Sequence, residues 1–366
     1  MRRINTLKSV CLSLLIAGAA LPATAQLTPR LPGSIVESAS VGGAERNAID
    51  SFVATLATDA TGDDAQKAAA AFAALVEPLR ENRPSVSFRQ AFAQSAAPLI
   101  ADLLASDSQP ARLAGLRLAG NLATGDTAGL VAGALSDDDA GIRVFAGVQA
   151  RRVFEVSSQN GPALTDTQAA QLVTALTDAM DATRDRIMTE TLIRALGMAS
   201  QTRPREMSAS RAVAAASLGQ GMSVRVRDTS PSDLPDIHDP ILIAASALTR
   251  TMSDPGSRAP DAAAKASVEF GGDVLAALLA REIQGLNDVN SETDIRLLRA
   301  AESLIYFARR RQTENANGDA SSVPLTNLAG LLESGSRDFR QELVALIGPG
   351  SSMLSQFGLA DDRFLK

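Results

Sequence analysis

The residue types that most often carry out catalysis are scarce in this chain of 366 residues. His238 is its only histidine, and its only cysteine, Cys11, lies near the N-terminus. One imidazole cannot build a multi-histidine metal centre. Asp236 and Asp239 flank His238, but sequence neighbours rarely orient the same ring, and no Gly-x-Ser-x-Gly elbow is present. We therefore expect His238 in a loop or at the start of a helix, and we expect no metal and no cofactor.

Carboxylates offer a second route to chemistry. Two of them facing each other across a cleft, one with a raised pKa, could hydrolyse glycans. Five glutamates occur in segments with helical spacing, and the sequence does not decide which of them converge: Glu190, Glu269, Glu282, Glu302 and Glu342. A carboxylate-dependent hydrolase of helical-toroid type, acting on envelope glycans, is therefore the alternative functional hypothesis.

Aspartates cluster at three places, 63–64, 137–139 and 361–362. None of the clusters has the alternating oxygen ligands and central glycine of a calcium loop. We expect them to cap helix N-termini, where free backbone N–H groups favour a carboxylate. Gly219-Gln220-Gly221 has no buried strand before it and no third glycine, which predicts a turn rather than a nucleotide-binding loop.

The elements that would position these side chains are helices. Apolar residues recur at helical spacing along most of the chain, as in Ile49, Phe52, Val53 and Leu56, and alternating strand patterns are nearly absent. The segment 103–112 is also echoed 31 residues later by 134–143, each with a leucine, a Ser/Asp turn and a following arginine. Related copies run from Leu172 to Arg186 and from Leu331 to Arg340.

This helix–turn–helix repetition resembles the HEAT-repeat and armadillo-like families. The resemblance implies an all-α fold, an α-solenoid of stacked antiparallel helix pairs, with about eight pairs at 35–45 residues each. Stacking explains the repetition because one pair cannot bury its apolar stripe alone. In these families the second helices line the concave face, which implies a binding strip of Arg117, Arg151, Arg152 and Arg194. Arg112 and Arg143, which follow Asp107 and Asp138, are expected to make structural ion pairs or carbonyl contacts.

The N-terminus carries an export signal. Arg2, Arg3 and Lys8 precede a short apolar run, and Ala23-Thr24-Ala25 offers small residues for cleavage after Ala25. The run is too short for a permanent membrane span. Cleavage would change the formal charge from −6 to −9, because residues 1–25 hold three cations and no anion. We expect a periplasmic or secreted protein whose stability comes from packing, because no thiol would remain.

The sequence further predicts a flexible leader at 26–43, N-terminal repeats at 44–200, an irregular insert at 201–237, C-terminal repeats at 238–356 and a tail at 357–366. Prolines 204, 231 and 235 and the two glycines motivate the insert.

The acidic charge and an aromatic content of 3% argue against nucleic acid and carbohydrate as ligands. The leading hypothesis is a noncatalytic scaffold of the bacterial cell envelope that binds a protein or another envelope component. Its oligomeric state is left open.

Overall fold

The computed structural model describes residues 29–365 except 63, 81–82, 256–258 and 287–291, and the expected export signal lies outside these residues. The described chain forms helices and loops and no strand. The first helices of six successive pairs are α2 (Gly43–Ala60), α4 (Val86–Ala105), α6 (Gly125–Ala134), α8 (Asp166–Ala182), α10 (Ser208–Asp228) and α12 (Asp261–Ile283). The second helices are α3 (Ala65–Arg80), α5 (Gln109–Leu122), α7 (Ala140–Asn160), α9 (Arg186–Ser200), α11 (His238–Ser253) and α13 (Glu292–Asn315).

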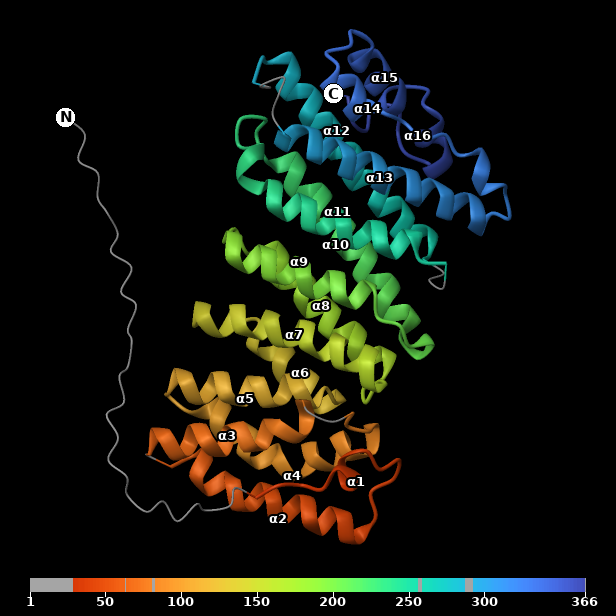
Figure 1. Cartoon of the computed structure of the whole chain (residues 1–366). Coiled ribbons are helices and arrows are strands. Elements are labelled where there is room, and N and C mark those ends of the chain that lie inside the picture. The colour runs from red at the N-terminus through yellow and green to blue at the C-terminus, as the bar shows by residue number, and fades with distance from the viewer. Residues whose placement is uncertain (1–28, 63, 81–82, 256–258, 287–291, 366) are drawn as a thin grey trace, which may run out of the picture.

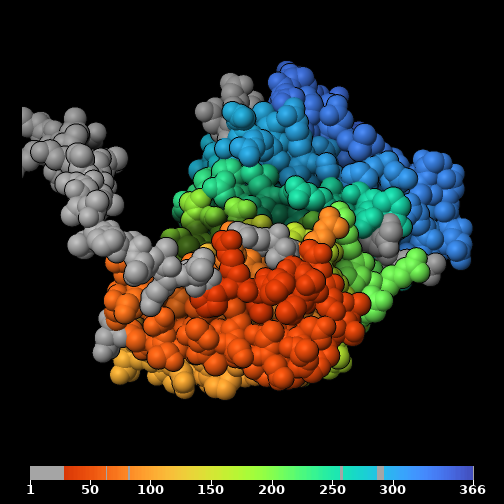
Figure 2. Space-filling view, turned by 60° about the horizontal axis from the view of Figure 1, so that its bottom comes forward, coloured from red at the N-terminus to blue at the C-terminus, as the bar shows by residue number. Residues whose placement is uncertain are grey.

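These helices form a solenoid-like stack of two layers. The second helices pack in order from α3 to α13, and α6, α8, α10 and α12 do the same in the other layer. The stack rises from α2 at the bottom of Figure 1 to α15 at the top. In Figure 2, turned so that the N-terminal end comes forward, the N-terminal helices lie in front and the C-terminal helices lie behind and above them.

Four short helices close the two ends. α1 (Gly33–Val36) precedes the first pair, and α14 (Leu328–Glu333), α15 (Asp338–Ile347) and α16 (Ser352–Phe357) follow the last. α14 packs on α13, and α15 packs on α12. Six full pairs are fewer than the eight expected from repeat length, because the six pairs span residues 43–315 and the described residues after them form three short α-helices instead of further long pairs.

Polar residues start the helices where the repeat pattern predicts. Asp139 accepts hydrogen bonds from the backbone N–H groups of Gly141 at 2.7 Å and Ile142 at 3.2 Å, and Asp64 caps α3 in the same way. These two confirm the capping prediction for their clusters. The prediction was wrong for Asp361, which accepts a hydrogen bond from Gly350 N–H in a loop.

The matching repeat arginines make an ion pair and carbonyl contacts, as expected. Arg112 forms an ion pair with Asp137 in the turn of the next repeat. Arg143 donates to the backbone carbonyls of Asp137 at 2.6 Å and Asp138 at 2.9 Å. Both arginines therefore hold loops in place.

The expectation of an irregular insert at 201–237 is wrong for most of that segment, because α10, a regular helix of 21 residues, lies within it. The prolines that suggested a loop lie outside α10. The expected turn at Gly219-Gln220-Gly221 is helical as well, because both glycines are sites of close helix approach. A Cβ on Gly219 would lie 2.8 Å from the backbone carbonyl carbon of Ala266 in α12, and one on Gly221 would overlap Met180 of α8.

The leader is also partly ordered, contrary to the expectation for 26–43. Val36 is fully buried, and its carbonyl accepts a hydrogen bond from Ser85 N–H at 2.9 Å. Arg30 forms an ion pair with Glu77 of α3 at 3.0 Å. An apolar residue in α1 thus draws the leader against the first helices.

Arg89 is the most deeply buried charged side chain among the described residues. Arg89 of α4 is fully buried and donates to the carbonyls of Leu122 at 3.2 Å, Ala123 at 3.4 Å, Asn160 at 3.3 Å and Gly161. These carbonyls lie at the C-terminal ends of α5 and α7, where the helix dipole favours a cation. Burial lowers the pKa of the Arg89 guanidinium to about 10, which leaves it protonated at neutral pH.

Candidate binding groove

Two of the four arginines proposed from the sequence meet in one groove on the face formed by the second helices. Arg151 of α7 and Arg194 of α9 both line it, together with Arg250 of α11. We call this site the arginine groove. Its volume is about 360 Å³, and its lining is completed by Ile193, Gly197, Met198 and Gln201 from α9 and by Leu242, Ile243, Ser246 and Ala247 from α11.

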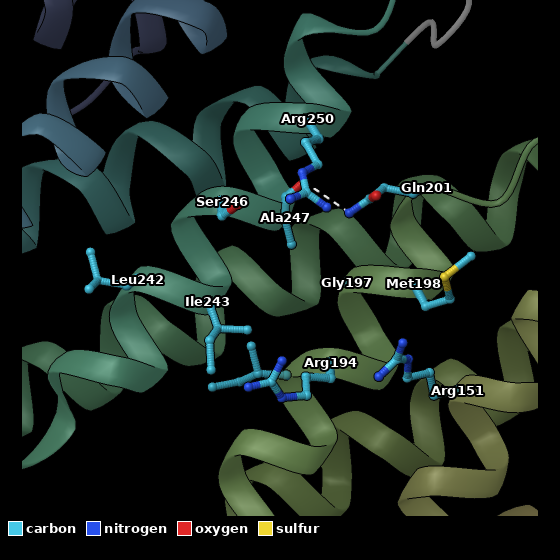
Figure 3. Close-up of a pocket in the computed structure, with 11 residues that line it drawn as sticks. Arg151, Arg194, Gly197, Met198, Gln201, Leu242, Ile243, Ser246, Ala247 and Arg250 are labelled. Atoms are coloured by element: carbon cyan, nitrogen blue, oxygen red, sulfur yellow. Dashed lines mark hydrogen bonds between the residues drawn. The ribbon is translucent and has the colours of Figure 1, made fainter.

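The floor of the arginine groove is a close crossing of two helices. A Cβ on Gly197 would lie 2.9 Å from the Cβ of Ala247, so glycine lets α9 and α11 approach at this point. Gln201 donates from Nε2 to the Ala247 carbonyl at 3.4 Å, the dashed line in Figure 3. The site is therefore held by two packed helices rather than by loops, which fixes its shape.

Cationic and polar side chains stand around this apolar floor. Arg250 and Gln201 lie at one end of the groove, and Arg194 and Arg151 lie at the other (Figure 3). Arg151 forms an ion pair with Glu155 at 2.8 Å. Arg194 and Arg250 are exposed, and neither makes an ion pair with any residue that the structure describes. The two guanidinium groups are free to bind a ligand.

The other two candidate arginines lie elsewhere. Arg152 bonds through Nε to Asn121 of α5 at 3.1 Å, which makes it a tie between neighbouring repeats. Arg117 lines a separate groove of about 770 Å³ between α3 and α5, with Arg80 and Arg30. Arg250 was not among the arginines proposed from the sequence, because the repeat pattern is weak around α11. Its place in the last turn of a second helix was the available signal.

The candidate catalytic residues do not gather. His238 is the first residue of α11, as expected. Its neighbour Asp239 pairs with Arg186 at 2.6 Å. Within the described residues, no group of three or more His, Cys, Asp or Glu side chains is placed to hold a metal ion.

The five glutamates have separate surroundings. Glu190 pairs with Arg186 at 3.0 Å, and Glu282 pairs with Arg340 at 3.2 Å. Glu302 is buried and accepts hydrogen bonds from the first N–H groups of α14, while Glu269 is half-buried on α12 and Glu342 is exposed on α15. None of the five lines the arginine groove.

Comparisons with known proteins do not identify a family. No family model matches the chain, and no curated protein matches it. Among solved structures, the crystal structure of an engineered protein is similar, with 19% sequence identity and a TM-score of 0.43, over 71% of this chain and 97% of that one. Among the described helices, none combines the length and hydropathy that a membrane span requires.

Proposed function

We propose that this chain is an exported, HEAT-like scaffold without catalytic activity, and that it binds an acidic protein segment along the face of its second helices. The observation that carries the proposal is the pair of unpaired arginines, Arg194 and Arg250, standing over an apolar floor. The chain has more acidic than basic residues, 41 against 35, so it has enough carboxylates to pair with Arg194 and Arg250. Because both arginines are nevertheless unpaired and lie on one rigid face, we infer that they bind an anionic group of another molecule.

The chemistry of the lining indicates the kind of anion. Arginine presents a planar fork that binds a carboxylate through two hydrogen bonds. The lining also includes Met198, Leu242 and Ile243, which are half-buried and offer contact to an aliphatic side chain. A segment with carboxylates on both sides of an aliphatic residue complements this arrangement. Such mixed contacts, a few arginines around an apolar centre, are typical of the residues that dominate protein–protein affinity.

Binding of defined peptides tests the proposal. Two fluorescent decapeptides would be compared by anisotropy, one alternating glutamate and leucine and one alternating lysine and leucine. We expect saturable binding of the acidic peptide alone, weakening with salt because surface ion pairs are screened. The double variant Arg194→Glu, Arg250→Glu should reduce its affinity at least about tenfold, the result of losing interactions worth about 1.4 kcal/mol or more.

Arg296→Glu is the matched control, because Arg296 is exposed on α13 and does not line the groove. It should leave affinity nearly unchanged. Equal loss in the control and in the double variant would show that overall charge, and not the groove, attracts the peptide. Capture from envelope extract with the wild type and the double variant would then identify the natural partner and test the export assignment.

A further inference from the structure

The last residues of the chain return to the stack as a tethered segment. Gly358, which follows α16, has a left-handed φ of 59°, and the chain then turns back towards α12 and α10. Residues 360–362 are exposed, whereas Phe364 is buried and Arg363 is half-buried. Arg363 and Phe364 therefore anchor this tail to α10 and α12, while Leu365 lies beside Gly348 and Asp361 accepts a hydrogen bond from Gly350 N–H.

The first anchor is charged. Arg363 binds the carboxylate of Asp273 in α12 through two hydrogen bonds, Nη1 to Oδ1 at 2.7 Å and Nη2 to Oδ2 at 3.0 Å. The Asp273 side chain is only 2% exposed. Ser223 of α10 donates to the same carboxylate and accepts from Arg363 Nη2 at 3.2 Å. A buried acid thus receives a fork-shaped cation, the arrangement that selects arginine over lysine.

The second anchor is aromatic. Phe364 packs against Gly272, the residue before Asp273, and a Cβ there would lie 2.3 Å from the ring carbon Cζ. The ring therefore occupies a notch that only glycine leaves open. The guanidinium of Arg363 lies over the same ring, 4.9 Å from its centroid, so the two anchors also support each other.

The helices that form this receptor are packed without the tail. α10 and α12 cross at Gly219 and Ala266, and their contact is the most extensive between any two described helices. The hydrogen bonds of the tail backbone are local, from Leu359 N–H to Leu354 and from Arg363 N–H to Ala360. Side chains alone join it to α10 and α12, as in the binding of a short peptide.

We propose that Gly272 and Asp273 of α12, with Ser223 of α10, form a peptide-binding site for an arginine followed by an aromatic residue, which the chain's own C-terminus occupies. A partner segment of the same chemistry can bind only after displacing the tail, so the tail acts as an inhibitory latch. Tethering gives it an effective concentration of the order of millimolar. This site lies apart from the arginine groove and does not depend on the function proposed for that groove.

The test uses the full chain with its own tail weakened. A fluorescent peptide with the sequence of residues 358–366 would be titrated against the wild type and against the double variant Arg363→Ala, Phe364→Ala. We expect at least about tenfold tighter binding to the double variant, because the tail of the wild type competes with the peptide. Peptides with alanine in place of the arginine or of the phenylalanine should bind about tenfold more weakly, since each loses one anchor.

Arg363→Lys gives a second variant for the titration, with a tail that is weakened less. It keeps the charge at residue 363 but cannot make both hydrogen bonds to the Asp273 carboxylate. Its affinity for the peptide should fall between those of the wild type and the double variant. Adding Asp273→Asn to either receptor should weaken binding about tenfold. The proposal is overturned if neither folded receptor binds the peptide at 1 mM, or if a scrambled peptide binds equally well. The acidic peptide of the arginine groove should bind all these variants alike.

Discussion

Replacing the buried arginine of α4 with methionine, Arg89→Met, tests whether this side chain joins the second and third helix pairs. Methionine fills most of the same volume, so the main loss is of hydrogen-bond donors. Four backbone carbonyls, from residues 122, 123, 160 and 161, would lose the donor that the guanidinium provides. No other arginine in the described chain is as deeply buried.

The net effect follows from two opposing contributions. An acceptor left without a donor costs about 1–3 kcal/mol when buried, and two of the four are only partly buried, so the total is about 6 kcal/mol. Removing a buried charge offsets part of this. Burial lowers the pKa of the Arg89 guanidinium to about 10, which corresponds to a desolvation cost of about 3 kcal/mol. We therefore expect Arg89→Met to destabilise the N-terminal repeats by about 3 kcal/mol.

Native-state hydrogen exchange measures this locally, because repeats contact only their neighbours and unfold in segments. Protection in α4, α5 and α7 should fall about 100-fold, and protection in α11 and α13 should be unchanged. Arg296→Met, an exposed change on α13, serves as the control. A loss below about 1 kcal/mol for Arg89→Met, or a loss spread evenly over all the helices, would refute the reasoning.

Three further substitutions test other contacts. Gly219→Ala should lower stability by about 1–3 kcal/mol in urea unfolding, because its Cβ would meet the backbone of α12 at 2.8 Å, whereas Gly43→Ala, with open space around it, should not. Burial raises the pKa of Asp166, but hydrogen bonds from the Ser210 hydroxyl and the first N–H groups of α10 outweigh it and leave the pKa below its usual value. Its contribution is therefore present above about pH 4 and lost as the pH falls through the lower folded value, so the advantage of wild type over Asp166→Asn in urea midpoint should disappear in strong acid. Glu302→Ala removes the acceptor for the first N–H groups of α14 and should lower hydrogen-exchange protection there about tenfold, with α5 unaffected.

Local pattern identified the parts of the fold that depend on neighbouring residues. Helical periodicity gave the all-helical class, the Ser/Asp turns gave the cap at Asp139, and the 31-residue echo gave the contacts of Arg112 and Arg143. These features were predictable because each depends on residues one turn or one repeat away.

The errors lie where packing between distant segments overrides local signals. The two glycines at 219 and 221, in a segment bracketed by prolines, predicted a turn, but α10 continues through them because its neighbours α12 and α8 approach closely there. The tail gave no sign of its partner, 90 residues away, in Asp273.

The helical spacing of apolar residues predicted the secondary structure, and the single histidine and single cysteine leave metal and thiol chemistry few residues to draw on. Only the tertiary structure decided which arginines stand together. Arg151, Arg194 and Arg250 are separated by 43 and 56 residues, and they meet because α7, α9 and α11 stack side by side in one layer. Helical spacing says which side of a helix a residue faces, but the crossing of whole helices sets its neighbours.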